Sequence, residues 1–193
     1  MNVNQTLIDR RVRLQQQLNK MYYLGKSIQL SSMSMRKRTI LIKRLFRLGG
    51  IVGGGAALAY LFGTHRTYDI DFFFTNKAAF YKAVELTYDC AEVDVCFGSP
   101  YKIFDLAVVR CFVFENDYRI SSEAWSALDT GICDIYPELS LNPIGTCRRM
   151  LTYHKRLGLF YKRNQVLKLR KLWNISDWMT NRLLKISLNL PDD

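Results

Sequence analysis

Hydrophobic and polar residues alternate strictly over 92–97, and the aromatic-rich run 69–74 is short and bounded by polar residues. Both patterns predict β-strands, because successive side chains of a strand point to opposite faces of its sheet. Residues 106–115 and 118–120 are expected to form two more strands around a turn at 116–117. Apolar residues recur at helical spacing in the remaining structured stretches, which predicts helices over 5–22, 35–47, 56–62, 76–88, 122–128, 146–160 and 165–186.

The order of these elements, with strands and helices interleaved in the middle of the chain, predicts an α+β (α/β) fold. We expect a small mixed sheet flanked by helices, with basic helical extensions at the N- and C-terminal ends. The predicted division is a basic extension over 1–47, a core over 48–121 and a basic helical region over 122–193.

Charge is distributed unevenly along the chain, whose formal net charge is +11. Residues 1–47 carry 11 Lys/Arg and one acid, residues 48–145 carry 6 and 13, and residues 146–193 carry 11 and 3. The acidic middle segment suits cation binding, and the basic end segments suit binding of a polyanion. This distribution argues against a metabolic enzyme that acts on small acids. The cations expected to contact nucleic acid are Arg36, Lys37, Arg38, Lys43, Arg44, Lys155, Arg156, Lys162 and Arg163.

The five cysteines are irregularly spaced and form no C-x-x-C pair, so a disulfide framework or zinc ribbon is not expected. Reduced thiols and the absence of a secretory pattern at the start favour a cytoplasmic location. The uncharged run 48–64 is too short and glycine-rich for a membrane span, and no stable membrane insertion is expected. The predicted helices 5–22 and 35–47 are long enough to pack against a protein partner.

Candidate chemistry is concentrated where Gly54-Gly55 is followed, after thirteen residues, by Asp69-Ile70-Asp71. Two carboxylates at i and i+2 of a strand share a face, and their mutual repulsion is relieved by a divalent cation. Oxygen ligands suit Mg²⁺ or Mn²⁺. A glycine pair at a helix start leaves backbone N–H groups accessible to a triphosphate. These are the parts needed to bind a nucleoside triphosphate (NTP) with its metal.

The glycine pair and D-x-D spacing resemble the signature of the DNA polymerase beta-like nucleotidyltransferases, which include tRNA CCA-adding enzymes and AbiEii-type toxins. GAALA at 55–59 and HRTYDID at 65–71 are similar to the AbiEii-type wording of the motif, while 104–108 and 142–158 resemble downstream elements of CCA-adding and phage-encoded relatives. The resemblance implies a nucleotidyltransferase-type sheet. It also implies transfer of a nucleoside monophosphate from an NTP to a nucleic acid, with RNA favoured. A bacterial or phage-infected cell is implied only by the resemblance of 104–108 and 142–158.

The resemblance also implies roles for individual residues. Asp69 and Asp71 would be catalytic metal ligands, together with Asp105, or alternatively Asp94, as third carboxylate. Arg110 is expected either to pair with an acid or to contact ribose or phosphate. The predicted nucleotide-binding set is Gly54, Gly55, His65, Arg66, Arg110, Arg148 and Arg149.

Two departures from the family pattern keep other functions open. Leu106 and Ala107 replace the Phe and Thr that follow the carboxylate in CCA-adding enzymes, and Ala56-Ala57 replaces their arginine after the glycine pair. One alternative is therefore a catalytically decayed fold that acts as a nucleic-acid-binding or assembly protein. The other is a toxin-like transferase that modifies tRNA or protein.

Overall fold

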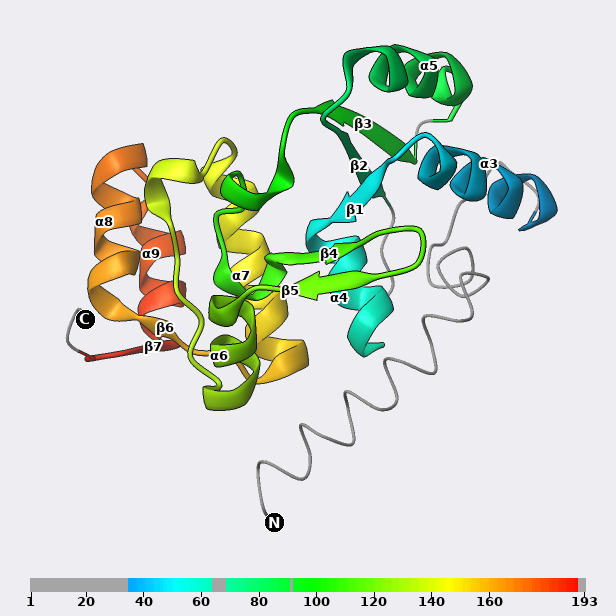
Figure 1. Ribbon diagram of the computed structural model, residues 1–193. Coiled ribbons are helices and arrows are strands. Elements are labelled where there is room, and N and C mark those ends of the chain that lie inside the picture. Colours follow the sequence, from blue (N-terminus) through cyan, green and yellow to red (C-terminus); the bar gives the residue numbers. More distant parts are fainter. Residues whose placement is uncertain (1–34, 64–68, 91, 191–193) are drawn as a thin grey trace. The chain divides into compact units, whose positions relative to one another are not determined.

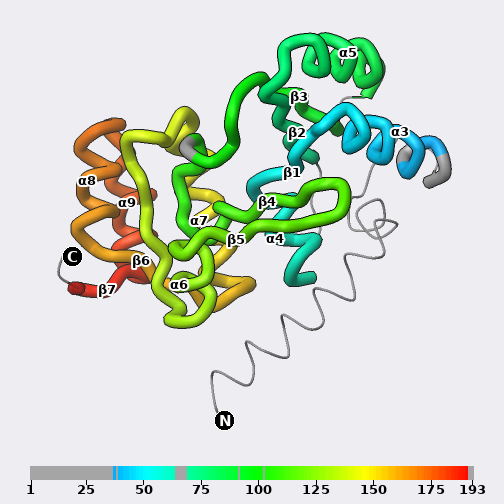
Figure 2. Tube along the Cα trace, in the orientation of Figure 1, coloured from blue at the N-terminus to red at the C-terminus, as the bar shows by residue number. Residues whose placement is uncertain are grey.

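A computed structural model describes residues 35–63, 69–90 and 92–190, so the helix predicted over 5–22 lies outside the described residues. The chain forms two compact units. Among the described residues, unit 1 comprises those up to 102 together with 111–120, and unit 2 comprises 103–110 and those from 121 to 190. The chain therefore enters unit 2 for eight residues, returns to unit 1 for a hairpin, and then stays in unit 2 (Figure 2).

Unit 1 is built on a five-stranded sheet of order β3-β2-β1-β4-β5 (Figure 1). Strands β2 and β3 are parallel, and all the other neighbours are antiparallel. The strands are β1 (Ile51–Gly53), β2 (Ile70–Phe74), β3 (Val93–Phe97), β4 (Cys111–Val113) and β5 (Tyr118–Ile120). The predicted mixed sheet with flanking helices is confirmed.

The described residues of unit 1 form three helices: α3 (Met35–Arg47), α4 (Gly54–Phe62) and α5 (Lys77–Thr87). The ring of Phe46 on α3 packs edge-on against Phe72 on β2, with centroids 5.1 Å apart, and Phe80 on α5 packs against Phe97 on β3 at 5.5 Å. Helices α3 and α5 therefore cover the face of the sheet that carries Phe72 and Phe97. Asn76 caps α5 by accepting a hydrogen bond from the Ala79 amide.

Two elements differ from the prediction. Strand β1 lies within the glycine cluster, where a strand was not expected. The predicted strand 106–115 is wrong in its first half, because Ala107–Val109 form a buried 3₁₀ turn, η3, and only Cys111–Val113 are extended. An apolar run of this length fits either a strand or a buried helical turn, which explains the error.

Unit 2 contains α6 (Ser122–Thr130), α7 (Pro143–Leu157), α8 (Arg163–Trp173) and α9 (Asp177–Leu184), with short parallel strands β6 (Tyr161–Lys162) and β7 (Ser187–Leu188). The single helix predicted over 165–186 is two helices, because Asn174 adopts a left-handed conformation with φ 47° and ends α8. No helix within the described residues is both long and apolar enough to cross a membrane.

Candidate functional site

Asp71 and Asp94 lie opposite each other on the parallel strands β2 and β3 of unit 1. On its other side Asp71 is opposite Gly53, the last residue of β1. Neighbouring strands are about 4.8 Å apart, so Gly53, Asp71 and Asp94 form one row across three strands. Residues opposite each other in register share a face, and the two carboxylates are therefore neighbours on one side of the sheet.

The hydrophobic core determines which face carries these carboxylates. Ile70, Phe72 and Phe74 of β2 are fully buried and point to the side covered by α3 and α5. Asp71 must then point to the opposite side, where it is partly exposed, and Asp94 beside it is exposed. Asp69 directly precedes β2, two residues before Asp71, and is exposed.

The row of Gly53, Asp71 and Asp94 also meets the beginning of a helix. Strand β1 ends at Gly53, and α4 starts at the next residue without a side-chain cap. Gly54 has φ 70°, a left-handed backbone that favours glycine. The first amides of a helix have no partner within it, and the helix dipole makes this end attractive to anions. The α4 N-terminus, with Gly54 and Gly55, therefore begins one residue from the carboxylate row.

The charges of both carboxylates affect the pKa of the Cys96 thiol. Cys96 lies two residues after Asp94, on the same face of β3. Burial raises the pKa of its thiol to about 11, and the negative charges of Asp71 and Asp94 act in the same direction. Two carboxylates that both act on one thiol concentrate negative charge at this part of the sheet.

The described residues include no group of three His, Cys, Asp or Glu side chains arranged to hold a metal ion. Asp71 and Asp94 are the pair of acids that the strand register brings together. Mg²⁺ is usually bound through one or two carboxylates, with substrate phosphates and waters completing its coordination. The carboxylates of Asp71 and Asp94 therefore fit a magnesium ion that binds together with a triphosphate. They do not fit an ion coordinated by protein ligands alone.

The predicted acid Asp105 belongs to unit 2, where it is buried. Its Oδ2 accepts hydrogen bonds from the Thr146 hydroxyl and from Nη2 of Arg149, the latter at 2.6 Å. Asp105 and Arg149 thus form an ion pair that ties the segment 103–110 to α7. Arg148, the other arginine predicted on this helix, is exposed.

Arg110 also belongs to unit 2 and does not lie in a strand, since it ends the turn η3. Its guanidinium lies 3.6 Å from the centroid of the Tyr136 ring, 3.5 Å from the Glu123 carboxylate, and donates to the Phe104 carbonyl. The acid beside Arg110 is Glu123, which is not one of the predicted metal ligands. His65 and Arg66 lie outside the described residues.

Most of the lysines and arginines predicted to contact nucleic acid have exposed side chains, among those that the structure describes. Lys37, Lys43 and Arg44 are exposed on α3, as are Lys155, Arg156 and Arg163 in unit 2. Lys162 differs, because it is buried and its Nζ lies 3.4 Å from Asp134. The side chains of Arg36 and Arg38 lie outside those described.

Comparisons with protein families, with curated proteins and with solved structures found no match for this chain.

Proposed function

We propose that the protein is a metal-dependent nucleotidyltransferase, which transfers a nucleoside monophosphate from an NTP to a nucleic-acid acceptor, with RNA favoured. The observation that carries this proposal is the row of Gly53, Asp71 and Asp94, beside the start of α4. It combines acidic oxygens for a cation with the amides of a helix N-terminus for phosphates, and both adjoin Gly53 in unit 1.

The reaction would be an in-line displacement in which an acceptor hydroxyl attacks the α-phosphorus and pyrophosphate leaves. Asp71 and Asp94, with Asp69 next to them, would hold Mg²⁺ or Mn²⁺. The bound ion would supply charge neutralisation and lower the pKa of a coordinated hydroxyl. The amides of Gly54 and Gly55 would bind the departing phosphates, because the helix terminus favours the negative charge that develops there.

The choice of third carboxylate is part of this proposal. Asp94 is in register with Asp71, whereas the Asp105 carboxylate is bound to Thr146 and Arg149 within unit 2. A carboxylate neutralised by an arginine is a poorer ligand for a cation than one that shares a face with a second acid. We therefore assign the role to Asp94.

The exposed cations would bind the acceptor through its phosphates. Lys37, Lys43 and Arg44 are exposed in unit 1, and Lys155 and Arg156 in unit 2. Each phosphate contact on a single strand contributes a slope of about −0.7 to the dependence of log K on log salt. Binding of single-stranded RNA should accordingly weaken steeply as salt rises.

Incorporation of label from α-³²P-NTPs into RNA and DNA oligonucleotides in the presence of Mg²⁺ tests the proposal. The double variant Asp71→Asn, Asp94→Asn should lose at least roughly 100-fold in rate, because the cation loses both charged ligands. Asp89→Asn is the matched control, since Asp89 is an exposed acid of unit 1 outside the carboxylate row. Unchanged incorporation by the double variant would refute the assignment of these residues.

A catalytically decayed fold that binds nucleic acid is the second candidate. The observation that favours it is that the described residues hold no three-ligand metal group. Such a protein would bind RNA with the same salt dependence but incorporate no label from any NTP. If label entered protein in a cell extract, the acceptor proposed here would be wrong while the transferase chemistry would stand.

A further inference from the structure

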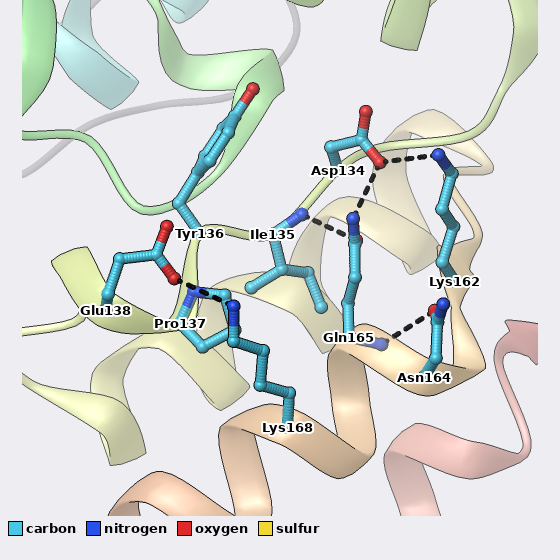
Figure 3. A pocket seen from close by; sticks show the side chains of 9 residues that line it. All are labelled: Asp134, Ile135, Tyr136, Pro137, Glu138, Lys162, Asn164, Gln165 and Lys168. Carbon is cyan, nitrogen blue, oxygen red and sulfur yellow. Dashed lines mark hydrogen bonds and ion pairs between the residues drawn. The ribbon is translucent and has the colours of Figure 1, made fainter. Parts of the chain in front are cut away.

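Unit 2 contains a cavity of about 520 Å³ that the proposed chemistry does not use. Residues 134–138 form one part of its lining, and Lys162 with the first half of α8 forms the rest (Figure 3). Its volume falls in the range of sites for small organic ligands. The cavity combines an aromatic ring, fixed polar groups and a charged rim, and each of these restricts the ligand.

The ring of Tyr136 stands at one side of this cavity, opposite Asp134 and Lys162 (Figure 3). Arg110 covers the ring at 3.6 Å and is itself held by Glu123. Tyr136 lines the cavity, whereas Arg110 does not. A ring held this firmly favours a flat aromatic partner, because stacking then requires little further ordering.

Asp134 presents a hydrogen-bond acceptor at the opposite side. Its Oδ1 accepts from Nε2 of Gln165 at 2.9 Å and lies 3.4 Å from Nζ of Lys162. Gln165 is fixed in this orientation, because its Oε1 accepts from the Ile135 amide at 2.9 Å. The second oxygen of Asp134 points away from both partners (Figure 3). It can accept a hydrogen bond from the exocyclic amino group of a base.

The rim carries an ion pair between Lys168 and Glu138, with Nζ and Oε2 3.6 Å apart. Both side chains are more than half exposed, and an ion pair in water contributes little to stability. Lys168 can therefore exchange this carboxylate for a phosphate at small cost.

We propose that this cavity binds a nucleotide, with the base stacked on Tyr136, its amino edge on Asp134 and its phosphate near Lys168. The nucleotide can be free or the end of a strand, because both offer the same chemistry. The proposal is independent of the nucleotidyltransferase activity, since it involves no metal and no residue of unit 1.

Calorimetric titration of the full-length protein in EDTA tests the proposal, with nucleoside monophosphates in one arm and single-stranded oligoribonucleotides in the other. We expect AMP, CMP or GMP to bind more tightly than UMP, which lacks an amino group, if the ligand is a free nucleotide. If only oligoribonucleotides bind, the ligand is a strand end. Absence of binding in both arms would overturn the proposal.

Variants then locate the binding site. Tyr136→Leu and the nearly isosteric Asp134→Asn should each weaken binding at least tenfold. Tyr81→Leu removes an exposed tyrosine of α5 and should leave binding unchanged. Equal affinity in the wild type and in a folded Asp134→Asn variant would also contradict the proposal. The double variant Asp71→Asn, Asp94→Asn should retain this metal-independent binding, so failure here and failure of the transferase proposal are distinguishable.

Discussion

The reactivity of Cys96 reports on the charge of the carboxylate row. Burial and the charges of Asp71 and Asp94 hold the pKa of this thiol at about 11, so it is almost fully protonated at neutral pH. Replacing Asp71 by Asn removes one of these charges with little change in side-chain volume. The pKa of Cys96 should therefore fall, and its thiolate should become more abundant at any pH below 11.

The size of this effect follows from the sheet geometry. Asp71 and Cys96 are diagonal neighbours on adjacent strands, which places them roughly 7–8 Å apart. At that separation a unit charge contributes about 0.6–2.4 kcal/mol for effective dielectric constants between about 80 and 20. This corresponds to about 0.4–1.7 pKa units, or about one unit at the centre of the range. The thiolate fraction would rise about tenfold and its intrinsic nucleophilicity would fall about threefold, so alkylation should accelerate about threefold.

Timed alkylation with iodoacetamide at pH 8.5, followed by peptide mass spectrometry, measures this rate at Cys96 separately from the other cysteines. Cys111 is fully buried and serves as the internal control, and Asp89→Asn is the matched variant. The pH profile of the Asp71→Asn variant should lie about one unit below that of the wild type. If the rate and pH profile of Cys96 are the same in both proteins, Asp71 does not face this thiol and the row described above is wrong.

Two further predictions concern the free energy of unfolding. Gly50→Ala places a Cβ 2.8 Å from the Leu45 carbonyl oxygen, and urea unfolding should show a free energy of unfolding lower by about 3 kcal/mol. The control Gly49→Ala places a Cβ that meets no atom within 4 Å. It should lower the free energy of unfolding by about 1 kcal/mol, because Gly49 has φ 81°. Equal losses would contradict the close approach at Gly50. Asp105→Asn weakens a charged hydrogen bond to Arg149 and should cost about 2 kcal/mol in the same measurement. Label incorporation per folded molecule should not change, and its loss would instead make Asp105 the third metal ligand.

The local parts of unit 1 could be predicted from the sequence. Helix α3 has the predicted bounds, and β2, α5 and β3 lie within one or two residues of theirs. Each has a clear hydrophobic period, and Asn76 marks the start of α5 with a capping side chain. Strand β1 could not be predicted, because Gly53 and its glycine neighbours carry no side chains whose pattern would indicate a strand.

The contacts of the candidate site depend on pairing between distant segments, which a single sequence does not reveal. From the sequence, Asp105 is favoured over Asp94 because the residues after it resemble a family element, whereas Asp94 is supported by its place in an alternating strand. The register of β2 with β3 sets Asp94 beside Asp71. The Asp105 carboxylate is bound to Thr146 and Arg149 within unit 2. The ion pair of Asp105 with Arg149 joins residues 44 positions apart, and no local pattern indicates it.

The most direct test of the central claim is the Mg²⁺-dependent part of NTP binding, taken as the difference between calorimetric titrations in Mg²⁺ and in EDTA. This difference excludes any metal-independent binding in unit 2. The wild type should bind the triphosphate more tightly in Mg²⁺, and the double variant Asp71→Asn, Asp94→Asn should show no difference between the two conditions. A wild type without Mg²⁺ dependence, or a double variant with the same dependence, would contradict the claim that these carboxylates hold the metal of a bound nucleotide.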